Sequence, residues 1–326
     1  MASDPGNPGS EAGAEAAGLT IVVLTRNRRE LLRGCLESIF AQEDPGIPLE
    51  FVVVDDGSSD GTAAMVRELT AGRGNWRLVC QPHRGIAAAR NAGIGAARSA
   101  WLAIVDDDFL LPAGYAREIA GYFRLHPEAE VVRFRVADAN TGFLSRALYA
   151  YQEAGMQRRL AVAGVLAGGS APGLDASGGT AFRCRVFGRV GLFDESFLRG
   201  TDTEFGLRLA AAGISVHFSP ALRIGHRVRP SLAEALAKAY AGGRSSWRLH
   251  AAGRGRAPGL PALVVLALRA PAAALYWSGW RAWRTGGPLR FPAYWPLMLA
   301  LETAARAGFL SAAMGRGGVP GTAERP

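Results

Sequence analysis

The sequence predicts an α/β fold: a Rossmann-like, mostly parallel sheet flanked by helices, followed by a helical and apolar C-terminal region. Three observations predict it. Short apolar runs alternate with segments of helical periodicity over residues 19–228. Acidic and polar residues follow several of these runs directly, which is typical of the ligand-binding edge of a parallel sheet. Beyond Pro230 the chain becomes apolar, with tryptophans and arginines but few acids. The alternation favours parallel strands with helices on both faces of the sheet.

The first half of the pattern begins at Leu19. The predicted strands are LTIVVLT, LEFVVVD, WRLVCQ and WLAIVD, and the predicted helices are RRELLRGCLESIFAQ, AAMVRELTA and GIAAARNAGIGAAR. Polar clusters follow three of the strands, at residues 25–27, 55–57 and 106–108. Because the carboxyl ends of parallel strands meet at one edge, we expect these clusters to converge.

The second half is less regular. AEVVRFRVA is a predicted strand followed by a helix through Met156, and GGTAFRCRVFGRVGLFDESF reads as strand, helix and turn. TDTEFGLRLAAAG predicts an amphipathic helix ended by Gly213, and ISVHFSPALRIGH an extended segment. SLAEALAKAYAGGRSSWRLH predicts a helix with a basic end. The predicted organisation is a disordered leader (1–18), a catalytic domain (19–229), a helical, membrane-associated region (230–316) and a disordered tail (317–326).

Composition indicates compartment and partner class. The leader has acids and no apolar core, so we expect neither a signal peptide nor a transit peptide there. The three cysteines are scattered without metal-binding spacing, which favours a reducing compartment. A net charge of +9 and a pI near 10.2 favour anionic partners, or reflect only an arginine-rich surface.

Two apolar stretches near the C-terminus, residues 260–280 and 291–314, approach the ~20 residues of a transmembrane helix. Arg269 interrupts the first, and Glu302 with Arg306 interrupts the second. Between the stretches, tryptophans alternate with arginines as in an interfacial belt. We expect attachment to a membrane surface, with spanning left open; a soluble helical hairpin is the alternative.

The stretch WLAIVDDDFLLP ends a buried strand in three adjacent carboxylates, Asp106, Asp107 and Asp108. Like charges so close repel and lose hydration, so a positive group must lie beside them. A divalent cation carrying a phosphorylated ligand fits this requirement, because it also neutralises the phosphates. A turn or helix N-cap accounts for one aspartate but poorly for three.

Five segments in order resemble the family 2 glycosyltransferases, inverting enzymes of the A-type fold. These segments are IVVLTRNRRELLRGCLESIFAQ, FVVVDDGSSDGT, RGIAAARNAGI, WLAIVDDDFLLP and GTDTEFGLRLAAAG. The resemblance covers roughly residues 19–228 and implies a nucleotide-sugar donor, a glycan or lipid-linked acceptor and Mg²⁺ or Mn²⁺. It implies that a set of rim residues binds the donor nucleotide. These are Thr25, Asn27, Asp55, Asp56, Arg90 and Asp106.

The resemblance also implies the metal ligands, although their register is ambiguous. Two acids separated by one residue give Asp106 and Asp108, whereas counting back from Pro112 makes Asp107 the ligand. We take Asp107 as the first choice and Asp108 as the second. His226 lies where family members often place a metal-binding histidine, or it is an ordinary packed histidine.

The segment GTDTEFGLRL resembles the family's catalytic-base segment, usually written Glu before Asp. Asp202 is therefore the candidate base, and Thr201 stands at the position of the glutamate. Asp202 as a simple helix cap is the alternative. The candidate acceptor-side residues are Gly178, Gly179, Thr201, Arg244 and Trp247.

The function expected from these residues is inverting transfer of one sugar to a hydroxyl acceptor at the cytoplasmic face of the cell membrane, or in the cytoplasm. The alternatives are a non-catalytic nucleotide-sugar or glycan binder and a sugar nucleotidyltransferase. The latter, like a dinucleotide-binding dehydrogenase, is disfavoured because VVLTRNRRELL contains no glycine loop. Nucleic acid is disfavoured because the C-terminal basic residues lie among tryptophans and apolar stretches, a pattern that suits an anionic membrane better.

Overall fold

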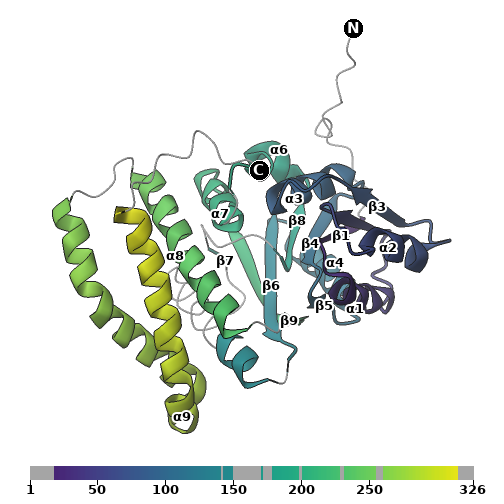
Figure 1. Ribbon diagram of the computed structural model, residues 1–326. Helices are drawn as coiled ribbons and strands as arrows, with labels where there is room; N and C mark the ends of the chain where they lie inside the picture. Colours follow the sequence, from purple (N-terminus) through teal and green to yellow (C-terminus); the bar gives the residue numbers. More distant parts are fainter. Residues whose placement is uncertain are drawn as a thin grey trace. The chain divides into compact units, whose positions relative to one another are not determined.

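The computed structural model describes residues 18–140, 142–149, 170–171, 178–197, 200–227, 231–254 and 260–314. The chain divides into two compact units (Figure 1). The first comprises residues 1–139 and 163–227, and the second comprises residues 140–162 and 228–326. Each unit is described by itself below.

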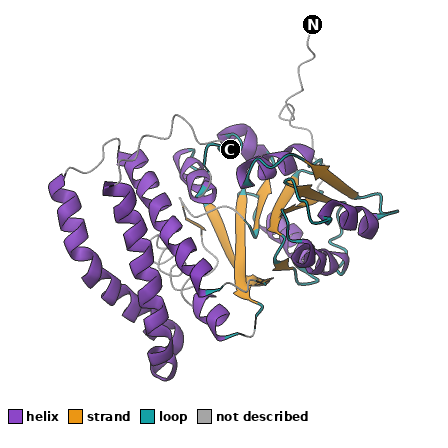
Figure 2. Cartoon of the chain, in the orientation of Figure 1, coloured by secondary structure: helices purple, strands orange, loops and turns teal. Residues whose placement is uncertain are grey.

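The first unit is built on one mixed sheet, whose described strands are drawn as orange arrows in Figure 2. The strands are β1 (Leu19–Thr25), β2 (Leu49–Asp55), β3 (Trp76–Cys80), β4 (Trp101–Asp106), β5 (Phe109–Leu110), β6 (Val131–Asp138), β7 (Ser170–Ala171), β8 (Thr180–Arg183) and β9 (Val216–His226). Their order is β3-β2-β1-β4-β8-β6-β9-β5, with β7 paired to β9. Strands β1 to β4 are parallel, whereas β8 runs antiparallel to both β4 and β6.

The strand register brings the predicted polar clusters to one edge. In the parallel pairs, Thr25 lies opposite Asp55, and Leu24 lies opposite Asp106. All three strands are buried along most of their length, because their apolar residues face helices on both sides of the sheet. The predicted convergence of the strand ends is therefore present in the structure.

The helices of the first unit cover both faces of this sheet. They are α1 (Arg29–Phe40), α2 (Thr62–Thr70), α3 (Ile86–Ala96), α4 (Tyr115–Leu125), α6 (Arg185–Val190) and α7 (Thr201–Ala211). Apolar residues of α1 and α4 form a core with Leu19, Ile21 and Val23 of β1. The other face of β1 meets α3, where a Cβ on Gly93 would overlap the Val22 side chain. The predicted fold class, a mostly parallel sheet flanked by helices, is confirmed.

The second unit is helical. It contains residues 143–149, α8 (Leu232–Arg254) and α9 (Leu260–Met314). The 143–149 segment packs there through Ala147 and through Phe143, which contacts Tyr294, although the sequence places this segment in the catalytic domain. The predicted continuation of that helix to Met156 lies outside the described residues.

Helix α9 folds back on itself (Figure 1). Trp295 Nε1 donates a hydrogen bond to Ser278 Oγ, 17 residues earlier, whereas a straight helix would separate such residues by about 25 Å. Helices α8 and α9 approach closely at small residues, since a Cβ on Gly243 or on Gly308 would overlap the backbone of the other helix. The sequence predicts two apolar stretches, and the structure joins them in one folded-back element.

Candidate active site

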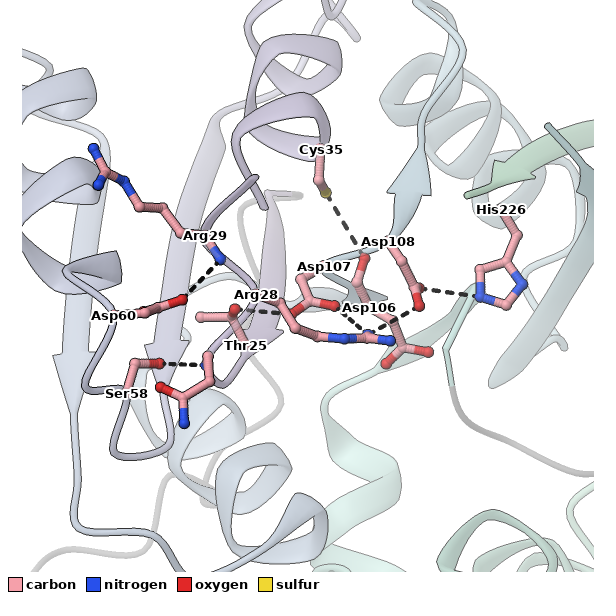
Figure 3. Close-up of polar contacts among 11 residues, drawn as sticks. Thr25, Arg28, Arg29, Cys35, Ser58, Asp60, Asp106, Asp107, Asp108 and His226 are labelled. Atoms are coloured by element: carbon pink, nitrogen blue, oxygen red, sulfur yellow. Dashed lines mark hydrogen bonds and ion pairs between the residues drawn. The ribbon is translucent and has the colours of Figure 1, made fainter. Parts of the chain in front are cut away.

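Arg28 provides a positive group beside the three carboxylates at the end of β4. Its NH1 donates to Asp107 Oδ1 at 2.7 Å and to Asp108 Oδ2 at 2.9 Å (Figure 3). Three adjacent carboxylates require a positive group, and from the sequence we expected a metal ion there. Arg28 is not among the predicted site residues, although TRNRRELL places basic residues directly after β1 and at the start of α1.

Asp107 is held by protein groups at both carboxylate oxygens. Besides the Arg28 contact, Oδ2 accepts a hydrogen bond from Thr25 Oγ1 at 2.8 Å. Burial raises the pKa of Asp107 to about 6, against the opposing effects of Arg28 and Thr25. Thr25 therefore lies at the rim as predicted, and its hydroxyl orients Asp107.

Asp108 faces His226 with its second oxygen. Asp108 Oδ1 lies 3.2 Å from His226 Nε2, because Arg227 N donates to Asp108 O and so aligns the end of β9 with this loop. Burial alone would raise the pKa of Asp108, but His226 and Arg28 outweigh it and hold the pKa below its usual value. The structure thus brings together the predicted pair Asp108 and His226.

Asp106 is the least satisfied of the three acids. Among the described residues, no donor is hydrogen-bonded to its carboxylate, and burial raises its pKa despite the nearby charge of Arg90. Gly178 lies against it, since a Cβ at Gly178 would overlap Asp106 Oδ2. The adjacent Gly179 has a φ of +78°, which a residue with a side chain rarely adopts. Gly178 therefore lets the chain pass close to the acid, and Gly179 supplies the backbone conformation of the turn beside it.

Asp55, Asp56 and Asn27 organise the neighbouring loops. Asp55 Oδ1 accepts from Ser58 N at 2.9 Å, and Asn27 Oδ1 accepts from Ser59 N at 2.7 Å. Asn27 itself has a φ of +51°.

Each carboxylate oxygen of Asp56 accepts two hydrogen bonds from described residues. Gln81 Nε2 and Arg84 N donate to Oδ1, and His83 Nδ1 and Gly85 N donate to Oδ2. Burial would raise its pKa, but these donors lower it. A nucleotide contact of these side chains remains a prediction.

Arg90 is a buried cation with few partners. Its side chain comes from α3, is 4% exposed, donates to Thr201 Oγ1 at 2.6 Å and lies over the Phe193 ring at 5.0 Å. Its Nε has no hydrogen-bond partner among the described residues. Burial lowers the pKa of Arg90, whereas the charges of Asp106 and Asp202 raise it. Arg90 therefore interacts electrostatically both with Asp106 at the end of β4 and with Asp202 at the start of α7.

The start of α7 carries the candidate base. Gly200 precedes it with a φ of +78°, and Asp202 lies in its first turn. Thr201 is buried, with its hydroxyl bonded to Arg90. Glu204 pairs with Arg208, whose Nε and NH2 donate at 2.6 and 2.9 Å. The Glu204 carboxylate is therefore engaged by Arg208, and the role of Asp202 as the base stays a prediction.

Arg244 and Trp247 belong to the second unit. Arg244 is exposed on α8, and Trp247 is buried there with its ring edge-on to Phe309 at a centroid distance of 5.4 Å. The burial of Trp247 is thus explained by packing between α8 and α9. The acceptor role of Arg244 and Trp247 stays a prediction.

The side chains at the end of β4 fit a divalent cation that takes some of its ligands from the protein and the others from a bound substrate. The described residues contain no group of three or more His, Cys, Asp or Glu side chains suited to a metal. However, Asp108 Oδ1 and His226 Nε2 are 3.2 Å apart, close to the ~3.0 Å between ligands at right angles on an ion with bonds of ~2.1 Å. Mg²⁺ commonly uses one or two carboxylates and takes its other ligands from water and phosphates.

Comparison with known proteins agrees with the site. The profile of Glycosyl transferase family 2 matches residues 20–184. The succinoglycan biosynthesis protein ExoO of Rhizobium meliloti is 44% identical over 91 residues, which cover 28% of this chain and 25% of ExoO. The putative glycosyltransferase EpsH of Bacillus subtilis is 30% identical over 105 residues, covering 32% of this chain and 30% of EpsH.

A longer match is the pre-mycofactocin glycosyltransferase of Mycobacterium tuberculosis, 26% identical over 242 residues, which cover 74% of this chain and 49% of that protein. The chain thus spans less than half the length of these three relatives. The family profile covers the strands β1 to β4 with their acidic rim and reaches β8. On this match, the chain belongs to glycosyl transferase family 2.

Proposed function

We propose that the chain transfers one sugar from a nucleotide-sugar donor to an acceptor hydroxyl, with inversion at the anomeric carbon. The observation that carries this proposal is the grouping of Asp106, Asp108, His226, Arg90 and Asp202 at one end of the sheet. Asp106, Asp108 and His226 offer ligands for a divalent metal ion. The buried guanidinium of Arg90 can balance the charge of the phosphates, and the carboxylate of Asp202 can accept a proton.

Asp202 is the proposed general base. It takes the proton of the acceptor hydroxyl while that oxygen attacks the anomeric carbon, and the nucleoside diphosphate departs from the opposite face. Negative charge then develops on the departing phosphates. Arg90 stabilises that charge, because its burial strengthens its interactions and its Nε has no hydrogen-bond partner in the part of the chain that the structure describes.

Asp108 and His226 are the proposed cation ligands, with Asp106 beside them. We prefer Asp108 to Asp107 because Asp108 Oδ1 faces His226, a second possible ligand, whereas the Asp107 oxygens accept hydrogen bonds from Thr25 and Arg28. When bound, Mg²⁺ or Mn²⁺ would supply a Lewis acid that neutralises the diphosphate. Gly178 keeps the space beside Asp106 clear of any side chain.

The printed name of one relative supports a proposal for the acceptor class. ExoO is named for succinoglycan biosynthesis, and we propose a growing glycan or lipid-linked sugar as acceptor here. The test is incubation with UDP-, GDP- and dTDP-sugars in the presence of a membrane lipid extract, with mass spectrometry of the products. We expect one new glycosylated product and release of the nucleoside diphosphate. Formation of a nucleotide sugar from a triphosphate and a sugar phosphate would instead indicate a nucleotidyltransferase.

We further propose that the second unit attaches to the cytoplasmic face of an anionic membrane. Residues 231–314 contain ten Lys and Arg but two Glu, and anionic lipids attract basic side chains by about 1 kcal/mol each. Large apolar side chains on α9 are exposed, including Leu268, Leu275 and Tyr276. Of the two predicted apolar stretches, the second overlaps the one described segment, Pro292–Met314, that is long and apolar enough to cross a membrane.

Flotation with vesicles tests this attachment. We expect the full chain to float with phosphatidylglycerol vesicles more than with phosphatidylcholine vesicles, and less at high salt. Leu268→Glu should weaken binding roughly tenfold, since it removes a side chain that would be buried in lipid. The matched control is Leu125→Glu, because Leu125 and Leu268 are 76% and 75% exposed in different units. Equal binding by both variants would contradict the proposed surface.

A further inference from the structure

Arg28 links two buried acids through a single nitrogen. Its NH1 contacts both Asp107 and Asp108 (Figure 3). The Arg28 side chain is 43% exposed, whereas the two aspartate side chains are 4% and 6% exposed. A partly solvated cation therefore balances carboxylates that are themselves shielded from water.

The Arg28 guanidinium and the proposed divalent cation would both lie against the carboxylate of Asp108. Asp108 uses Oδ2 for Arg28 and turns Oδ1 toward His226. A divalent cation on Asp108 would lie close to the guanidinium, and two positive groups on one carboxylate repel each other. Arg28 and the cation therefore compete for the same negative charge.

Arg28 lies at the edge of the fold and not in its hydrophobic core. It immediately precedes α1, and it is its backbone carbonyl, not its side chain, that accepts the hydrogen bond from Leu32 N at the start of the helix. The side chain as a whole is 43% exposed, so solvent reaches part of it. A planar guanidinium also matches phosphate oxygens, so a diphosphate on the cation offers it a second partner.

We propose that Arg28 is an exchangeable counter-ion of the acidic triplet. In the ligand-free protein it supplies the positive charge that a divalent cation supplies in the donor complex, and it turns to the donor diphosphate when the cation binds. This inference rests on the cation site of the proposed function. It follows that the cation alone binds weakly, because it must first overcome the positive charge of Arg28.

The test measures Mn²⁺ binding by electron paramagnetic resonance, without donor, in the full-length chain. Arg28→Gln should bind Mn²⁺ about tenfold more tightly than the wild type, because a competing positive charge is gone. Arg28→Lys should restore affinity close to that of the wild type. The matched control is Arg29→Gln, which removes the same charge one residue away, where the guanidinium lies 4.0 Å from Glu30, and should leave Mn²⁺ affinity unchanged.

Thermal unfolding shows whether the Arg28→Gln variant is folded. We expect Arg28→Gln to unfold at a lower temperature than the wild type in EDTA, and Mn²⁺ to raise that temperature more than it does in the wild type. Unchanged or weaker Mn²⁺ binding by folded Arg28→Gln would overturn the inference alone. Absence of Mn²⁺ binding in the wild type and in every variant would overturn the cation site of the proposed function as well.

Discussion

Asp202→Asn is expected to lower kcat about 10²- to 10⁴-fold while donor KM changes little. The substitution preserves the size of the side chain and its place in the first turn of α7, but an amide cannot take the proton of the acceptor hydroxyl. Transfer therefore loses its base, whereas the donor still meets the β4 acids. Steady-state kinetics with the donor and acceptor identified by mass spectrometry measure both quantities.

Glu204→Gln is the matched control for Asp202→Asn. Glu204 lies two residues further along the same helix, and its oxygens are engaged by Arg208. We expect a loss of stability, on the order of 1 kcal/mol or less for a partly exposed pair, with kcat retained. A large loss of kcat in Glu204→Gln together with a retained rate in Asp202→Asn would move the base to Glu204.

The strand pattern of the first unit is readable from sequence because burial on both faces makes each strand a continuous apolar run. Residues 19–25 and 101–106 are such runs, and both form strands with these bounds. The position of β8 between β4 and β6 in the sheet could not be predicted from such a pattern. Strand partners far apart in sequence are chosen by tertiary packing, which no local pattern encodes.

The folding back of α9 also depends on contacts that the local pattern does not encode. Its sequence includes the breaker residues Gly286, Gly287 and Pro288, which indicate an interruption. Whether the two arms then meet depends on contacts such as Trp295 with Ser278. Two separate helices and one folded-back element therefore share the same hydrophobic pattern.

At the site, strand ends could be predicted but side-chain partners could not. The rule that parallel strands end at one edge places Thr25, Asp55 and Asp106 together, as the register shows. The contacts of Arg28 with Asp107 and Asp108 are not predictable from sequence, because they depend on the conformation of a long, flexible side chain. A requirement for positive charge can be inferred from three adjacent acids, but the group that meets it cannot.

Chelation should abolish sugar transfer, and Asp108→Asn should mimic chelation. Loss of the cation removes several kcal/mol of stabilisation from the departing diphosphate, so we expect turnover to fall at least about 100-fold. Asp108→Asn keeps the side-chain shape next to His226 but removes the negative charge that would hold the ion. Turnover in EDTA, and its recovery on adding back Mg²⁺ or Mn²⁺, measure the first effect, and Mn²⁺ titration of the variant measures the second.

Asp107→Asn decides between the two possible metal registers. Asp107 is the neighbour of Asp108 and is equally buried, but Thr25 and Arg28 already occupy its oxygens. If Asp108 is the ligand, Asp107→Asn should keep most of its Mn²⁺ affinity, because the direct ligand remains and only a nearby charge is lost. Tight Mn²⁺ binding by Asp108→Asn with loss of binding by Asp107→Asn would assign the cation to Asp107. Full transfer activity in excess EDTA would remove the cation from the mechanism and leave Arg28 and Arg90 to balance the phosphate charge.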